Sequence, residues 1–285
     1  MPASAVKRTS VDFADVTAGI AERLKSGTLL PFLGPGVTAL SETTVPTSHE
    51  ALAAWLGSRV ALPRRARGNC WAAAQYIESF RHRVTLDRMM ADAFAHPVPP
   101  TPLHQAIARL APAMVVDTWY DAALRSAFAG RSDWGEIQAA SRAAPGENRW
   151  YRAYDCTGTE CAPAMADGWR TLIYKPHGCV TPFSNFLISD ADYVEVLTEI
   201  DIQTPIPDTV KTRRAGSGFL FLGCRFHDQS LRTYARQIAK RSGGGHVVVI
   251  DGELSRNEER FLLELDASVV RRDLAGFAAE LAERL

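Results

Sequence analysis

The feature that most constrains the fold is a series of short, largely apolar segments. They lie at residues 28–33, 113–117, 171–175, 218–222, 247–250 and 267–270. Their apolar residues run consecutively instead of alternating with polar ones, which predicts strands that are buried on both faces. Such strands, separated by helices, are typical of a parallel sheet. The sequence therefore predicts an α/β fold with a doubly wound parallel sheet.

Helical patterns fill most of the chain between these segments. They occupy residues 11–25, 48–60, 68–96, 103–110, 228–240 and 274–285, and a further helix begins at Ser189 or Asp190. The proline-rich residues 97–102 interrupt the helical pattern. Residues 130–168 are polar and punctuated by glycine and proline, so we expect loops and short helices there.

The composition is that of a globular chain without net charge. Its 285 residues suffice for one large α/β domain, or for one domain with a sizeable insertion. Acidic and basic residues balance at 32 each, so we expect neither nucleic acid nor a membrane as a partner. No apolar run reaches the ~18 residues of a membrane span, and residues 1–17 lack the apolar stretch of a signal peptide. We therefore expect a cytoplasmic protein.

The five cysteines are scattered, which argues against a disulfide framework and for a reducing compartment. Cys156 and Cys161 are close enough in sequence to form half of a zinc site. No second pair follows at zinc-ribbon spacing, and His177 is the only nearby histidine. We therefore expect free thiols and no bound metal, with zinc as the lesser alternative.

Ligands of doubly wound folds bind beyond the carboxyl ends of the strands. The residues directly after each strand are therefore the main candidates for a binding site. The first such group is residues 34–38, with the sequence GPGVT. Its glycines allow a phosphate to approach the backbone closely, and a helix N-terminus favours the phosphate charge. A simple tight turn is the alternative, and Pro35 removes one amide that a phosphate could use.

The second group is residues 117–121, with the sequence DTWYD. Two aspartates and two aromatic residues at a strand end could hold an aromatic ring and its amide. The alternative is the start of a helix, with Asp117 as the cap and with Trp119 and Tyr120 in the core.

The remaining groups follow the strands at residues 171–175 and 218–222. His177 precedes a glycine and titrates near neutral pH, which suits a general base, although a lone histidine is more often structural. Gly223 ends its strand and Asp228 opens a helix, an arrangement suited to a ribose or a phosphate. Ordinary turn and N-cap chemistry is the alternative for that last pair.

In this order, the four groups resemble those of SIR2-like domains in the sirtuin superfamily. The similarity is greatest to the zinc-less bacterial branch related to antiphage-defence NAD hydrolases. Residues 34–38 match the GAGVS-type loop of that family, and residues 117–121 match its TTNYD-type strand end. Residues 175–178 (KPHG), followed by SDADY at 189–193, match its KLHGS block. Residues 223–232 (GCRFHDQSLR) match its GYSxxDxxLR block.

The resemblance implies a fold, a ligand and a reaction. The fold would be a Rossmann-like doubly wound sheet in one domain over residues 1–285, with a smaller helical insertion at residues 40–100. The ligand would be NAD or ADP-ribose, bound across the strand ends without a metal. Relatives cleave the nicotinamide–ribose bond of NAD through an oxocarbenium-like state, as glycosides are cleaved.

The resemblance also implies roles for individual residues. His177 would be the catalytic base, and Asp121 would orient the nicotinamide or its ribose. Gly34 and Gly36 would approach the pyrophosphate, and Thr38 would contact it. Gly223 and Cys224 would line the adenosine side. The full implied set of NAD-binding residues is Gly34, Pro35, Gly36, Val37, Thr38, Thr118, Trp119, Tyr120, Gly223, Cys224 and Asp228.

The sequence departs from the family pattern at one position, and this departure leaves several functional hypotheses open. Trp119 stands where the family has an asparagine that positions the nicotinamide ribose and water, and an indole cannot replace the paired donor and acceptor of an amide. The first hypothesis is an NAD glycohydrolase. The second is a degenerate domain that binds NAD or ADP-ribose as a regulatory or partner subunit. A protein deacylase comes last because the zinc module is missing. Regulation would then come from a partner protein or from homo-oligomer assembly.

Overall fold

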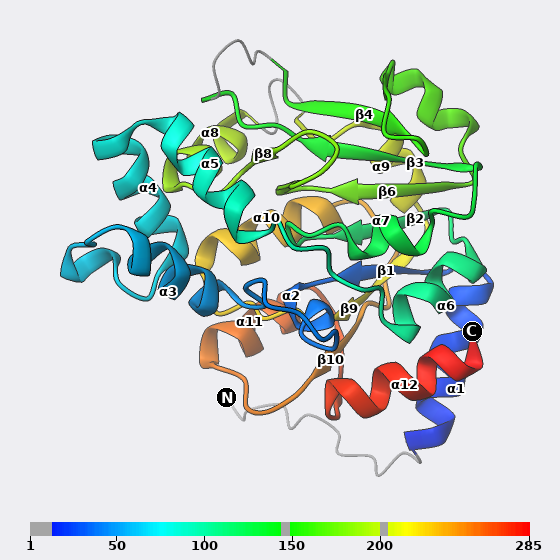
Figure 1. Cartoon of the computed structure of the whole chain (residues 1–285). Helices are drawn as coiled ribbons and strands as arrows, with labels where there is room; N and C mark the ends of the chain where they lie inside the picture. Colours follow the sequence, from blue (N-terminus) through cyan, green and yellow to red (C-terminus); the bar gives the residue numbers. More distant parts are fainter. Residues whose placement is uncertain (1–12, 144–148, 200–204) are drawn as a thin grey trace.

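The computed structural model describes residues 13–143, 149–199 and 205–285 (Figure 1). Within these ranges the chain forms a nine-stranded sheet of order β11-β10-β9-β1-β2-β6-β3-β4-β5. The strands are β1 (Leu29–Leu33), β2 (Met114–Asp117), β3 (Trp134–Ala139), β4 (Tyr151–Asp155), β5 (Glu160–Cys161), β6 (Thr171–Lys175), β9 (Gly218–Leu222), β10 (Val247–Ile250) and β11 (Ser268–Arg271). The sheet is parallel from β11 to β3, and β4 and β5 extend it antiparallel. The predicted Rossmann-like α/β fold is confirmed.

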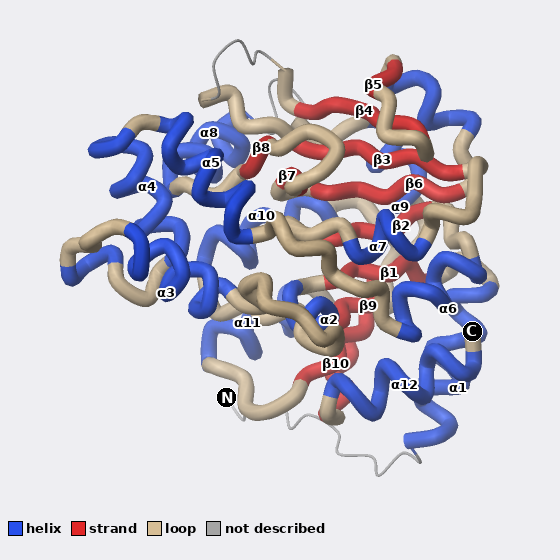
Figure 2. Tube along the Cα trace, viewed as in Figure 1, coloured by secondary structure: helices blue, strands red, loops and turns tan. Residues whose placement is uncertain are grey.

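Helices cover both faces of the sheet (Figures 1 and 2). On β1, Leu29 and Leu33 pack toward one face, whereas Leu30 and Phe32 pack toward the other. The first face is covered by α1 (Phe13–Lys25), α6 (Pro102–Leu110), α7 (Ala123–Ala127) and α12 (Leu274–Arg284). The second is covered by α8 (Asp190–Glu199), α9 (Asp208–Arg214), α10 (Gln229–Ala239) and α11 (Arg256–Glu264). Burial on both faces is the physical reason for the uninterrupted apolar runs of these strands.

A group of helices projects from the sheet between β1 and α6, at the left of Figure 1. It consists of α3 (His49–Arg59), the 3₁₀ turn η1 (Arg64–Ala66), α4 (Cys70–Arg81) and α5 (Arg83–Ala93), and we call it the helical module. The module has its own apolar core, which includes Trp71, Met90 and Trp119. The buried Arg83 ties it to the rest of the chain by donating to both carboxylate oxygens of Asp192, at 2.9 and 3.0 Å.

Two local expectations are wrong. Residues 130–168 contain β3, β4 and β5, and β3 is buried beside β6. Its polar Glu136 and Gln138 interrupt the apolar pattern of the strand. Glu136 accepts from Arg125 at 3.2 Å, and Gln138 Nε2 donates to the Thr181 carbonyl at 2.7 Å, whereas Gln138 Oε1 has no hydrogen-bond partner among the described residues. The helical pattern of residues 68–96 is divided into α4 and α5 at His82, whose φ of 68° interrupts the helix.

Shorter elements complete the fold. They are α2 (Pro35–Thr38), the 3₁₀ turn η2 (Pro163–Gly168) and a small sheet of β7 (Gly178–Cys179) and β8 (Asn185–Phe186). Across the described ranges, none of the helices combines the length and the apolar character that a membrane crossing requires.

Candidate functional site

The two glycine turns predicted from the sequence pack directly against each other. The Gly34 amide donates to the Leu222 carbonyl at 2.8 Å, and the Gly36 amide donates to the Gly223 carbonyl at 3.0 Å. A Cβ atom on Gly36 would lie 2.8 Å from the Gly223 Cα atom, and Gly223 has a φ of +64°. Glycine is therefore required here for the contact between two backbones, and both amides are already hydrogen-bonded.

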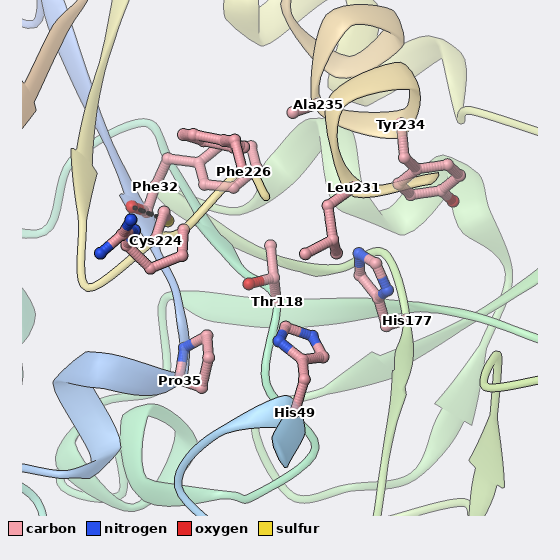
Figure 3. Close-up of a pocket in the computed structure, with 11 residues that line it drawn as sticks. Phe32, Pro35, His49, Thr118, His177, Cys224, Phe226, Leu231, Tyr234 and Ala235 are labelled. Atoms are coloured by element: carbon pink, nitrogen blue, oxygen red, sulfur yellow. Dashed lines mark hydrogen bonds between the residues drawn. The ribbon is translucent and has the colours of Figure 1, made fainter. Parts of the chain in front are cut away.

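A small cavity lies where the strand ends meet the helical module (Figure 3). Its walls come from the ends of β1, β2, β6 and β9, from the first residues of α2 and α3 and from the first two turns of α10. The free space is about 30 Å³. The lining residues are Phe32, Pro35, His49, Thr118, His177, Cys224, Arg225, Phe226, Leu231, Tyr234 and Ala235.

His177 reaches the cavity from the turn after β6. Its Nδ1 atom is hydrogen-bonded to the Tyr193 hydroxyl of α8, and the Tyr234 ring lies at 5.1 Å between centroids. Among the described residues, the Nε2 atom of His177 has no hydrogen-bond partner. Burial, together with the charges of His49 and Lys175, lowers the pKa of His177 to about 3. The imidazole is therefore neutral at physiological pH, with Nε2 available to a ligand.

Tyr193 and Tyr120 are buried phenols near His177. Tyr120 donates its hydroxyl to the Leu187 carbonyl at 2.9 Å. A phenol hydroxyl can donate or accept, so Tyr193 can bond to His177 Nδ1 in either neutral tautomer of the imidazole. All three side chains are buried, which holds the imidazole in one orientation.

His49, the first residue of α3, also lines the cavity and was not predicted from the sequence. Its ring stacks on Trp71 at 4.8 Å and meets Trp119 edge-on at 5.1 Å. Burial and the neighbouring His227 lower the pKa of His49 to about 4, so this imidazole is neutral as well. The local signal was weak, because only the fold brings the start of α3 to the end of β6.

Residues 117–121 form a buried layer next to the cavity. Lys175 holds this turn by donating to Asp117 Oδ2 at 2.8 Å, to the Asp121 carbonyl at 2.9 Å and to the Trp119 carbonyl. Burial alone would lower the pKa of Lys175, but the charge of Asp117 raises it, so the ammonium group is retained. The Asp121 carboxylate accepts from Thr38 Oγ1 at 2.7 Å and from the Ala123 amide at 2.8 Å.

Trp119 points away from the cavity into the helical module. Its indole nitrogen donates to the Pro46 carbonyl at 2.8 Å, and its ring contacts Phe94 and Tyr120. His49, and not Trp119, therefore supplies the polar side chain on that wall of the cavity.

The turn after β9 contributes a cation at the edge of the cavity. Arg225 donates to Glu258 at 2.8 and 2.9 Å and to the Glu253 carbonyl at 2.9 Å.

Two other predicted residues lie in the same turn. Burial raises the pKa of the Cys224 thiol, which is therefore uncharged. Asp228 caps α10 by accepting from the Ser230 amide at 2.7 Å.

The structure brings together some of the residues predicted from the sequence and separates others. Four line the cavity, namely Pro35, Thr118, His177 and Cys224. Gly34, Gly36 and Gly223 form the contact between the two turns. Val37, Thr38, Trp119, Tyr120 and Asp121 are buried around it, and Asp228 lies at the start of α10.

The sequence also matches a known protein family. The family model of the SIR2-like domain matches residues 113–270, which is more than half of the chain. The chain belongs to the SIR2-like family. No curated protein matches it. The family is NAD-related, and the matched part of this SIR2-like chain includes the 117–121 turn, His177 and the turn after β9. The GPGVT loop and His49 precede the matched residues.

The expectation about metals concerns Cys156 and Cys161 of this SIR2-like chain. Both are free thiols, and both are only partly buried. In the part of the chain that the structure describes, no group of three or more histidine, cysteine, aspartate or glutamate side chains could hold a metal ion.

Proposed function

We propose that this SIR2-like chain binds NAD at the carboxyl ends of β1, β2, β6 and β9 and hydrolyses its nicotinamide–ribose bond. The observation that carries the proposal is the His177 imidazole. It is neutral, its Nδ1 atom is bonded to Tyr193, and its Nε2 atom is left for a ligand in the cavity. A neutral, fixed imidazole at the strand ends can accept a proton from water or from a ribose hydroxyl, and it remains unprotonated at neutral pH.

The reaction follows from the chemistry of the bond. Departure of nicotinamide takes the bonding electron pair and leaves an oxocarbenium-like ribose. A water oxygen then bonds to the anomeric carbon, and its proton passes to His177 Nε2. The products are nicotinamide, ADP-ribose and one proton, which His177 releases to solvent. His49 would hydrogen-bond the nicotinamide side of the substrate, because it is the polar side chain on the wall next to Trp119.

Binding a whole dinucleotide requires the cavity to open. Its volume of about 30 Å³ is far below the roughly 300–1,000 Å³ of typical small-molecule sites. The segment best placed to move is the turn after β9 with the start of α10, which supplies Arg225, Phe226 and Leu231 to one wall. Pro35 and Gly36 face this segment across the glycine contact, and this position supports binding of the pyrophosphate between the two turns in the open state.

A second candidate is a domain that binds NAD or ADP-ribose without cleaving it. The observation that favours it is the position of Asp121 and Trp119, since neither side chain lines the cavity and Asp121 is already hydrogen-bonded to Thr38. Incubation with NAD separates the two candidates. Release of free nicotinamide supports the hydrolase, whereas saturable binding of ADP-ribose without nicotinamide release supports the binding domain.

A further inference from the structure

A second cavity lies on the helical module, apart from the site at the strand ends. Its volume is about 500 Å³, and it is formed by the last residues of α3 and α4 and by one face of α5. Three arginines line it, namely Arg59, Arg81 and Arg88, and the only acidic side chain in its lining is Asp92. Thr85 lies one helical turn before Arg88 on the same face of α5.

Among the described residues, these three arginines lack carboxylate partners, in contrast to Arg83 of the same module. Arg83 lies next to Arg81 in sequence and pairs with Asp87 at 2.8 Å and with Asp192 at 2.9 Å. No residue in the described ranges forms an ion pair with Arg59, Arg81 or Arg88. Three like charges around one cavity repel each other, so an anion bound among them would relieve an unfavourable interaction.

Helix electrostatics explain only part of this arrangement. Arg59 and Arg81 end α3 and α4, where a cation interacts favourably with the helix dipole. Arg88 lies in the middle of α5, where the dipole gives no such benefit. In addition, the Arg59 guanidinium lies 3.6 Å over the Trp55 ring, which restrains it near the cavity.

We propose that this arginine cavity binds a small molecule with two or more linked phosphate groups. Guanidinium groups form paired hydrogen bonds with phosphate oxygens, and several of them together suit a diphosphate or a triphosphate better than a single carboxylate. A volume of about 500 Å³ lies in the range of small-molecule sites. The ligand would also contact the helix that carries His49, because α3 runs from His49 to Arg59, about 15 Å at 1.5 Å per residue.

The test compares two double variants that remove the same charge. Arg81→Gln/Arg88→Gln changes the cavity, whereas Arg64→Gln/Arg65→Gln removes two exposed arginines of η1 that do not line it. Calorimetric titration with inorganic pyrophosphate, at fixed ionic strength, measures the affinity of each protein. All four substituted side chains are exposed, and circular dichroism confirms that both variants are folded.

The expected result is at least a tenfold loss of pyrophosphate affinity for the cavity variant and less than a twofold loss for the η1 variant. Equal losses in the two variants would overturn the proposal, because they would indicate general charge attraction. Absence of pyrophosphate binding at millimolar concentration would also overturn it. So would binding of a single-stranded oligonucleotide that both variants weaken equally. NAD cleavage is not part of the readout, so this result is independent of the proposed hydrolase function.

Discussion

The Tyr193 hydroxyl is hydrogen-bonded to Nδ1 of His177, and both side chains are buried. A hydrogen bond at one imidazole nitrogen determines which nitrogen remains for a substrate. The bond to Tyr193 occupies Nδ1, so Nε2 is the nitrogen left for a ligand, and Nε2 can act as the proposed base when Tyr193 accepts from a protonated Nδ1. Tyr193 is therefore the residue that positions the proposed base.

Tyr193→Phe tests this relationship. Loss of the hydroxyl leaves the ring in place but frees Nδ1, so we expect kcat for nicotinamide release to fall about 10–100-fold with little change in KM. The comparison variant is Tyr174→Phe, which removes a buried hydroxyl of β6 that has no hydrogen-bond partner among the described residues. Equal effects of the two substitutions on kcat would mean that Tyr193 acts only through stability.

The pH dependence of turnover tests the environment of His177. A general base acts in its unprotonated form, and the lowered pKa of about 3 keeps His177 unprotonated throughout the pH range from 5 to 8. We therefore expect kcat to be constant over that range. An imidazole with the ordinary pKa of about 6.5 would lose about thirtyfold in rate at pH 5. A rate that falls with an apparent pKa near 6.5, while circular dichroism shows a folded protein, would contradict the assignment.

Lys175 is predicted to stabilise the 117–121 turn. Lys175→Met leaves the buried Asp117 without its cation, so we expect a loss of about 3–5 kcal/mol in the free energy of unfolding. Lys211→Met, which breaks an exposed pair with Asp208, should cost at most about 1 kcal/mol. Urea denaturation measures both. The double variant Lys175→Met/Asp117→Asn should recover part of the loss, and no recovery would argue against a charge effect.

Trp119→Asn restores the residue type of related domains but removes a large side chain from the core of the helical module. We expect a loss of about 3–5 kcal/mol in the free energy of unfolding and no gain in nicotinamide release, since Trp119 does not line the cavity. Denaturation and turnover should be measured on the same preparation. Faster turnover with unchanged stability would show that the indole limits the reaction.

The strands that the sequence revealed are those with uninterrupted apolar runs, such as β1 and β9, because burial on both faces excludes polar residues. β3 was missed because Glu136 and Gln138 are buried with partners from distant segments, Arg125 and Thr181. The helix break at His82 was not predicted, because a single residue with positive φ does not change the spacing of the apolar residues around it.

The residues of the candidate site likewise fall into those that could be predicted from the sequence and those that could not. Residues directly after strands could be predicted, because the ends of parallel strands meet at one edge of a sheet. His49 and Tyr193 meet His177 only through the packing of α3 and α8, which local patterns do not encode. Thr38 and Asp121 were expected at the ligand, but they hydrogen-bond each other, a pairing across 83 positions that the sequence does not reveal.

If His177 is the base for cleavage of NAD, its substitution must greatly reduce nicotinamide release, and measuring this release is the most direct test. The comparison is between wild type, His177→Gln and His96→Gln. His96 is an exposed histidine that does not line the cavity. We expect wild type and His96→Gln to release nicotinamide at similar rates. The rate of His177→Gln should be lower by at least about 100-fold, the contribution of a general base, with ADP-ribose binding retained. Wild-type turnover by His177→Gln, or a wild type that binds ADP-ribose and releases no nicotinamide, would contradict the claim.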